Sequence, residues 1–208
     1  MTPATPPKIR KWRWLRRGLG ALLLLATVLY VGCTGPRDLA LYPEAGSSPY
    51  RLPWEAGETH RCIQGNRAVV SHRGRDEFAY DFLMPVGTKV CAARSGVVTR
   101  VEQSHDGHGT SMPNNLVVVQ HGDGSLGWYL HLKQNGALVH EGESVQQGQA
   151  LALSGNVGRS LCPHLHFHLT DAYRVYQRVT FSDVDATTDL GIPRMFKAYT
   201  AAGPGGGG

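Results

Sequence analysis

The sequence predicts an all-β domain of mainly antiparallel strands, with the architecture of a barrel-sandwich hybrid. From about residue 62 onward, short stretches rich in β-branched and aromatic residues alternate with turn residues, and none of them has a strong helical period. The pattern Gly-x-x-Val-x-x-Gly-x-x-Leu over residues 142–151 suits two tight turns around a short strand and is typical of barrel-sandwich folds. The candidate strands are residues 68–71, 79–83, 89–93, 96–103, 116–121, 127–132, 150–154 and 164–171.

Residues 1–33 are predicted to be a signal peptide or a membrane anchor. Six basic residues and no acidic residue precede or begin a short apolar run over residues 19–31, which favours export. These charges account for the net charge of +5, so the basic balance does not indicate nucleic-acid binding. The pair Gly32-Cys33 resembles the end of a bacterial lipoprotein cleavage box. A lipid on Cys33 and an uncleaved anchor both remain open, and either places the protein in the cell envelope, on the periplasmic side.

The rest of the chain divides by composition. Residues 34–59 are rich in Pro, Gly and Ser and are predicted to be a linker. Residues 60–175 form the predicted domain, residues 176–202 a C-terminal extension packed on it, and residues 203–208 a disordered Gly-rich tail. Three linker residues are expected to pack on the domain: Tyr50, Leu52 and Trp54.

Four cysteines are compatible with an exported protein. If Cys33 is lipidated, Cys62, Cys91 and Cys162 remain, and three thiols cannot all pair with one another. A Cys62–Cys162 disulfide is one expectation, because both residues lie next to candidate site segments. The alternative is that all three are small buried thiols.

Residues 164–169 contain three histidines that alternate with three apolar residues. On an extended strand the imidazoles share one face and the apolar side chains share the other. Aligned imidazoles at the end of an apolar strand indicate a metal centre. The three histidines are His164, His166 and His168.

Several motifs follow one another in a fixed order between residues 62 and 172. They are YDFLMPVGTKV at 80–90, GVV at 96–98, NLVVV at 115–119, HGDG at 121–124, YLHL at 129–132, GNVGRS at 155–160 and PHLHF at 163–167. Together they resemble a lysostaphin/LytM-type zinc metallopeptidase domain. The resemblance implies Zn²⁺ as cofactor and the peptides of peptidoglycan as substrate.

The resemblance also implies a role for each of five residues. Zinc would be held by His72, Asp81 and His166, while His131 and His164 would face the attacking water. Three nitrogen and oxygen ligands leave a fourth position open, as a catalytic zinc site requires. A neutral imidazole can take a proton from the water, and an imidazolium can stabilise the oxyanion.

The identity of the first ligand remains open at this stage. The usual family spacing is His-x-x-x-Asp, but the residue four positions before Asp81 is Glu77. The nearest preceding histidine is His72, so we interpret residues 73–77 as a short excursion. Glu77 is the alternative ligand because zinc accepts carboxylates, and a site without metal is a third reading. His168 stands where the family often has Glu, and a supporting or packing role is expected for it.

The leading hypothesis is an exported zinc endopeptidase that hydrolyses peptide bonds in peptidoglycan stem peptides or cross-links. The alternative is a non-catalytic LytM-like domain that regulates another cell-wall hydrolase, although such relatives usually lose metal ligands. A carrier or carbohydrate-binding barrel is a third hypothesis, but a carrier would need a modifiable lysine near residues 142–151, and none is present. The expected partners are peptidoglycan peptides, the membrane and a regulatory protein, and no nucleic acid.

Overall fold

The computed structural model describes residues 20, 22, 35–68 and 70–203. The predicted signal or anchor segment, with its candidate lipid site at Cys33, lies almost entirely outside these residues, as does nearly all of the Gly-rich tail. Within the described part of the chain, no helix is both long enough and apolar enough to span a membrane.

The described residues form β-strands and three short 3-10 helices, in agreement with the predicted all-β class. The helices are η1 (Leu39–Leu41), η2 (Ala45–Ser47) and η3 (Gly74–Asp76). The strands are β1 (Thr59–Gln64), β2 (Tyr80–Leu83), β3 (Lys89–Cys91), β4 (Gly96–Glu102), β5 (Leu116–Gln120), β6 (Leu126–Leu130), β7 (Leu132–Ala137), β8 (Ser144–Val145), β9 (Ala150–Ser154), β10 (His164–Thr170), β11 (Tyr176–Gln177) and β12 (Ala198–Thr200).

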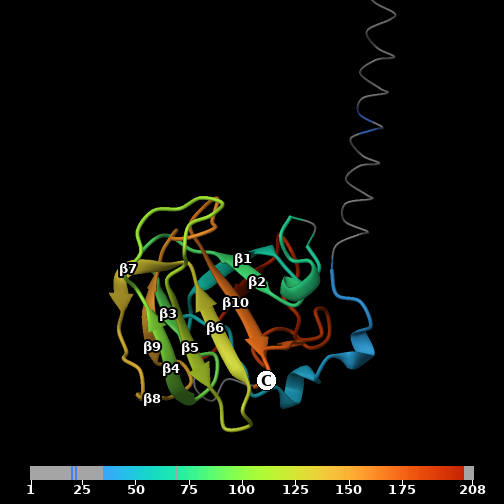
Figure 1. The fold of residues 1–208 in the computed structure, drawn as a ribbon. Helices are drawn as coiled ribbons and strands as arrows, with labels where there is room; N and C mark the ends of the chain where they lie inside the picture. The colour runs from blue at the N-terminus through green and yellow to red at the C-terminus, as the bar shows by residue number, and fades with distance from the viewer. Residues whose placement is uncertain (1–19, 21, 23–34, 69, 204–208) are drawn as a thin grey trace, which may run out of the picture.

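Two antiparallel sheets organise these strands (Figure 1). The larger sheet, nine-stranded as described, has the order β12-β1-β2-β10-β6-β5-β4-β8, with β11 paired to the far end of β10. The smaller sheet has the order β3-β9-β7. Both sheets contribute to one core, because Val90 and Leu151 of the smaller sheet cluster with Val117 and Val119 of the larger one. β10 lies near the middle of the large sheet, between β2 and β6.

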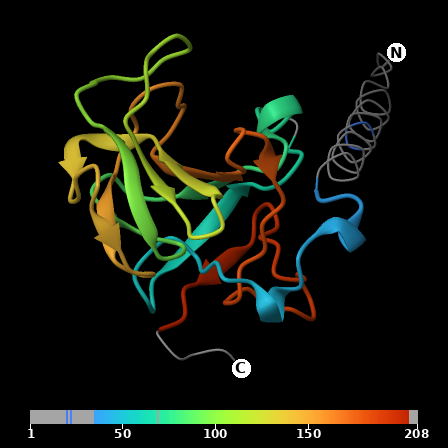
Figure 2. The ribbon, with the colours of Figure 1, turned by 60° about the horizontal axis from the view of Figure 1, so that its bottom comes forward.

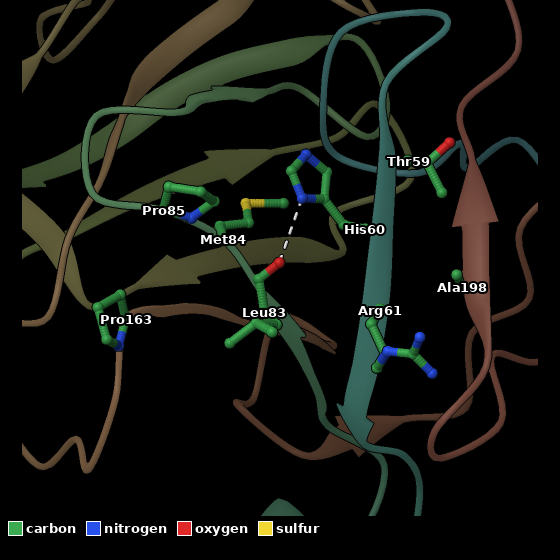
Figure 3. Close-up of a pocket in the computed structure, with 8 residues that line it drawn as sticks. All are labelled: Thr59, His60, Arg61, Leu83, Met84, Pro85, Pro163 and Ala198. Atoms are coloured by element: carbon green, nitrogen blue, oxygen red, sulfur yellow. Dashed lines mark hydrogen bonds between the residues drawn. The ribbon is translucent and has the colours of Figure 1, made fainter.

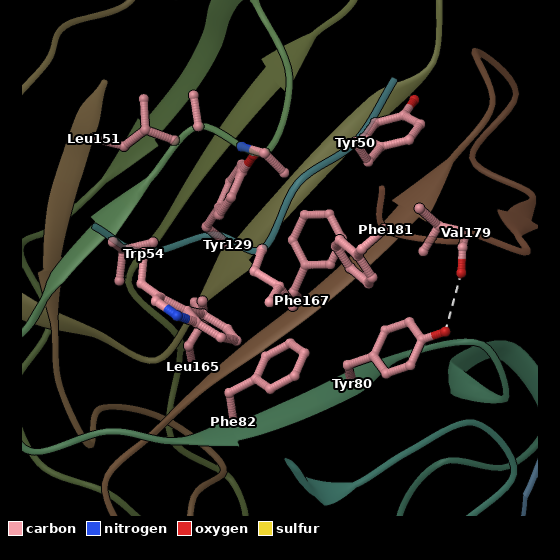
Figure 4. Close-up of a cluster of buried hydrophobic side chains, with 14 of the residues drawn as sticks. Tyr50, Trp54, Tyr80, Phe82, Tyr129, Leu151, Leu165, Phe167, Val179 and Phe181 are labelled. Carbon is pink, nitrogen blue, oxygen red and sulfur yellow. Dashed lines mark hydrogen bonds between the residues drawn. The ribbon is translucent and has the colours of Figure 1, made fainter. Parts of the chain in front are cut away.

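The two faces of β2, β10 and β6 have opposite chemistry. Phe82, Leu165, Phe167 and Tyr129 point into the aromatic core, where each is fully buried (Figure 4). The alternation of a strand therefore directs the intervening residues, including the histidines of β10, to the opposite face. The apolar half of the sheet thus stabilises the strands whose other half carries the candidate site.

Residues that precede β1 and residues that follow β11 in the sequence complete the core. Tyr50, Leu52 and Trp54, which precede β1, are buried in it. From the C-terminal side, Phe181 and Ile192 are fully buried, and β12 pairs with β1. Figure 2 shows the C-terminal and N-terminal segments crossing the same side of the domain. The residues beyond the family-like motifs are therefore structural parts of the fold.

Two expectations from the sequence are wrong. Residues 68, 70 and 71 belong to a turn region, which follows Arg67 with a left-handed φ of 58°, so the predicted strand over 68–71 does not form there. The Cys62–Cys162 disulfide is also absent, and the cysteines of the described residues are free thiols. β2 lies between β1 and β10, so Cys62 is about 10 Å from the strand that follows Cys162, beyond the reach of a disulfide of about 7 Å.

Candidate metal centre

The structure brings His72, Asp81 and His166 together on the polar face of the large sheet. Asp81 of β2 lies directly opposite His166 of β10 in the antiparallel pair, and His72 reaches them from the loop before η3. Asp81 Oδ1 is 2.8 Å from His166 Nδ1 and 3.2 Å from His72 Nε2. One potential ligand atom from each residue lies within 4.8 Å of the other two. The sequence distance between His72 and Asp81 is therefore no obstacle to a shared site.

Hydrogen bonds fix which atom of each ligand faces the site. The Nδ1–H of His72 donates to the Gly65 carbonyl over 2.9 Å, because a carbonyl can only accept. This leaves a lone pair on Nε2, which is buried and has no hydrogen-bond partner of acceptable geometry. Asp81 Oδ2 accepts a hydrogen bond from the amide of Gln64, so Oδ1 is the oxygen that faces both imidazoles.

The three residues fit a zinc ion. A buried imidazole nitrogen without a hydrogen-bond partner, beside a carboxylate oxygen and a second imidazole nitrogen, is a donor set that zinc prefers. Burial alone would raise the pKa of the Asp81 carboxyl, but the neighbouring His166 and His72 rings hold it well below its usual value. Burial opposes protonation of His72, yet the Asp81 carboxylate raises the pKa of that ring above its ordinary value. An ionised carboxylate buried beside two imidazoles favours a divalent cation.

His131 and His164 lie side by side next to this cluster. Their ring centroids are 4.6 Å apart, and the His131 ring is 5.9 Å from that of His166. The Nδ1–H of His131 donates to the Val157 carbonyl over 2.8 Å, and that of His164 donates to the Cys162 carbonyl over 2.8 Å. Each ring therefore keeps its Nε2 for the site, and His164 Nε2 is 3.6 Å from Asp81 Oδ1.

His131 occupies the junction between β6 and β7 with a left-handed φ of 65°. For a residue other than glycine this conformation is uncommon and turns the side chain away from the strand alternation. Burial, followed by the nearby His164 and His166, lowers the pKa of His131 to about 3. The ring is therefore neutral at neutral pH and keeps a lone pair on Nε2.

Gly155 is expected to tolerate no side chain, because it supports the backbone that carries His131. A Cβ at this position would lie 2.5 Å from the Lys133 nitrogen and 2.8 Å from the His131 carbonyl oxygen. Gly155→Ala should lower the free energy of unfolding by about 1–3 kcal/mol, as overpacking against backbone does. Gly122→Ala is the matched control, since nothing lies within 4 Å of its Cβ position. Urea unfolding of both variants measures the difference, and equal stability would contradict the close approach.

The structure separates the two alternatives that the sequence left open for the first ligand. Glu77 forms an ion pair with Arg67 over 3.0 Å and does not join the cluster of His72, Asp81 and His166. His168 lies behind the cluster, with its Nδ1 3.1 Å from His166 Nε2. His168 therefore contacts a candidate ligand and is not part of the ligand group itself.

Gln64 is a site residue that the sequence motifs did not indicate. It lies opposite Asp81 in the β1–β2 pair, donates to Asp81 Oδ2, and exchanges hydrogen bonds with Ser71 next to His72. It thus holds two of the three candidate ligands in place. Only a strand prediction over residues 59–64 would have placed Gln64 there, and Cys62 is the single buried residue of that strand.

An open groove of about 680 Å³ adjoins the site where β2 ends (Figure 3). Leu83 lies opposite His164 in the β2–β10 pair, and Pro163 directly precedes that histidine. The His60 ring lies at the same end, with Nδ1 3.2 Å from the Leu83 carbonyl. The remaining lining residues are Thr59, Arg61, Met84, Pro85 and Ala198. The lining residue Leu83 is two residues along β2 from the candidate ligand Asp81, which is about 7 Å of extended chain.

The His/Asp/His cluster and the two histidines beside it have the composition of a hydrolytic metal site. The model of peptidase family M23 matches residues 75–178, which is half of the chain. The chain belongs to peptidase family M23, in agreement with the lysostaphin/LytM-type resemblance of its motifs. His72 precedes the matched residues, so its place in the site rests on the geometry given above.

Individual proteins support the same assignment. The peptidoglycan DD-endopeptidase ShyA of Vibrio cholerae is 41% identical over 103 residues, which are 50% of this chain and 21% of ShyA. Lysostaphin of Staphylococcus simulans is 34% identical over 94 residues, or 45% of this chain and 18% of lysostaphin. The chain thus aligns with about a fifth of each relative's length. The structure of the M23 metalloprotease pseudoalterin, from the deep sea, matches 76% of this chain and 97% of its own at 20% identity and a TM-score of 0.50, which supports the fold.

Proposed function

We propose that this protein is an exported zinc endopeptidase that hydrolyses peptide bonds in peptidoglycan. The cluster of His72, Asp81 and His166 beside His131 and His164 carries the proposal, because it combines a zinc donor set with two imidazoles available for proton transfer. The family supports peptide hydrolysis, and the name of ShyA, a peptidoglycan DD-endopeptidase, supports peptidoglycan as the substrate. The basic, apolar N-terminal sequence supports export to the envelope.

Stem-peptide cross-links are the substrate we favour over glycine bridges. The support is the greater identity to the peptidoglycan DD-endopeptidase ShyA, at 41%, than to the glycyl-glycine endopeptidase ALE-1 of Staphylococcus capitis, at 34%. The groove beside Leu83 and Pro163 offers an extended peptide a largely apolar path next to His164. A peptide lying there would place a bond two residues away beside the metal ligands.

In the proposed mechanism, His72, Asp81 and His166 would hold the zinc ion. When bound, zinc would lower the pKa of a water molecule toward about 7 and polarise the scissile carbonyl. His131, neutral and held through Nδ1, can accept a proton at Nε2 and deliver it to the leaving amine. His164, held in the same way, can donate a hydrogen bond to the developing oxyanion once its Nε2 carries a proton.

Digestion of purified sacculi tests the proposal. Zinc-loaded protein is expected to release peptides from sacculi, and removal of the metal by a chelator should lower release by at least about a hundredfold, with recovery on adding zinc. Two cross-linked substrates, one with direct stem-peptide links and one with glycine bridges, identify the bond. A protein that carries stoichiometric zinc and cleaves neither substrate would contradict the proposal. A protein without zinc would favour the regulatory alternative.

A further inference from the structure

His166 is held from behind by a second imidazole. Its Nδ1 faces Asp81 Oδ1 over 2.8 Å, and its Nε2 is 3.1 Å from the Nδ1 of His168. The two histidines lie two residues apart on β10, so both side chains are on the polar face of the sheet. The contact follows from the strand and needs no loop to form it.

The positions of the ring protons determine which of the two histidines donates this hydrogen bond. Each imidazole nitrogen either carries a proton and donates or has a lone pair and accepts. A metal at the cluster requires the lone pair of His166 Nδ1, so the proton of that ring must be on Nε2. That Nε2–H then donates to His168 Nδ1, and His168 carries its own proton on Nε2. The hydrogen bond is compatible with only one tautomer of each ring when metal is bound.

The ring of His168 is itself clamped. It stacks on Tyr176 of β11 at 4.4 Å and 25°, and on Trp128 of β6 at 5.6 Å and 16°. Trp128 lies directly opposite His168 in the β10–β6 pair, and its indole N–H donates to Thr170 Oγ1 over 3.0 Å. The Arg174 guanidinium lies over the same indole at 5.6 Å. Two aromatic planes thus fix the plane of the imidazole that contacts His166.

We propose that His168 is a positioning residue that holds His166 in the Nε2–H tautomer and directs the Nδ1 lone pair toward the metal. This inference shares with the proposed function the assumption that the cluster binds zinc, and it does not require that the protein hydrolyses peptides. Partners of this kind orient metal-ligating histidines, and their loss typically costs about 10–100-fold in metal affinity. An imidazole at this position also provides a ring on which Trp128 and Tyr176 stack.

Two substitutions separate the hydrogen bond from the packing. His168→Phe keeps a ring between Trp128 and Tyr176 but removes the acceptor. His168→Asn loses the stacked ring but keeps an acceptor, because its amide oxygen can lie near the position of Nδ1. Competition with a chromogenic chelator measures the zinc affinity of each variant, and thermal unfolding of the zinc-free proteins measures packing separately.

We expect the phenylalanine variant to bind zinc about 10–100-fold more weakly than wild type and the asparagine variant to stay within about threefold. Long-range ¹H–¹⁵N spectra of zinc-loaded wild type should show His166 as the Nε2–H tautomer. Wild-type affinity in the phenylalanine variant would overturn the proposal, and so would an equal loss in both variants, since that would mean packing alone. A zinc-loaded protein that shows the expected pattern but hydrolyses no peptide would contradict only the endopeptidase function.

Discussion

His72→Ala is expected to abolish stoichiometric zinc binding, whereas Glu77→Ala should leave it intact. The buried Nε2 of His72 faces Asp81 and has no hydrogen-bond partner, while Glu77 is paired with Arg67 away from the cluster. Structural zinc in zinc-finger peptides binds with an apparent free energy of about 10–16 kcal/mol. On that scale, removing one of three protein ligands should cost several kcal/mol, or on the order of a thousandfold in affinity. Hydrolysis should fall with the bound metal.

The measurement is zinc content after dialysis, with Glu77→Ala as the matched control. Because His72 is fully buried, its removal can also lower stability, so circular dichroism checks the folding of each variant. His72→Gln is a second variant, which fills more of the space that the imidazole leaves. A folded His72 variant that retains zinc would exclude His72 as a ligand. Loss of zinc in Glu77→Ala with retention in His72→Ala would reverse the assignment.

The sequence predicted the structure well where the alternation of apolar and polar residues along a strand shows which side chains share a face. The alternation over residues 164–169 predicted which side chains of β10 share a face, and the antiparallel register then places His166 opposite Asp81. The strand at Ala150–Ser154 was predicted with the observed bounds. Such predictions succeed because burial on one face imposes a period of two that the residues themselves display.

The sequence was a poor guide where long-range contacts decide the structure. β1 is mostly polar and β12 has only three residues, and the two strands pair although they lie at opposite ends of the domain sequence. Gln64 acquires its position opposite Asp81 through the pairing of β1 with β2, and the contact of His72 with Asp81 depends on how residues 73–77 fold back through η3. The left-handed conformation of His131 likewise had no local signal, because a backbone fit against Gly155 and a hydrogen bond to Val157 stabilise it.

The second large effect is expected at His131, which should be needed for turnover and dispensable for zinc. His131→Asn is the informative variant, because asparagine tolerates the left-handed φ of 65° that most residues do not. It removes the imidazole Nε2 that faces the site while leaving the three candidate ligands unchanged. Loss of a general base typically costs about 10²–10⁴-fold, so kcat/KM on a cross-linked peptide should fall by that factor while zinc content stays near one per chain.

His164→Ala should behave in the same way, and His166→Ala should not. The Nδ1 of His164 is engaged by the Cys162 carbonyl and its Nε2 is 3.6 Å from Asp81, whereas His166 belongs to the cluster with ligand geometry. His140→Asn is the control for replacing a histidine, because that side chain is exposed beside Glu143. If His164→Ala and His166→Ala lose zinc equally, the division between ligands and proton-transfer groups is wrong. If the His164 variant keeps zinc and loses turnover while the His166 variant loses zinc, two histidines two residues apart on one strand have different roles. The Cys162 carbonyl holds Nδ1 of His164, whereas Nδ1 of His166 faces Asp81.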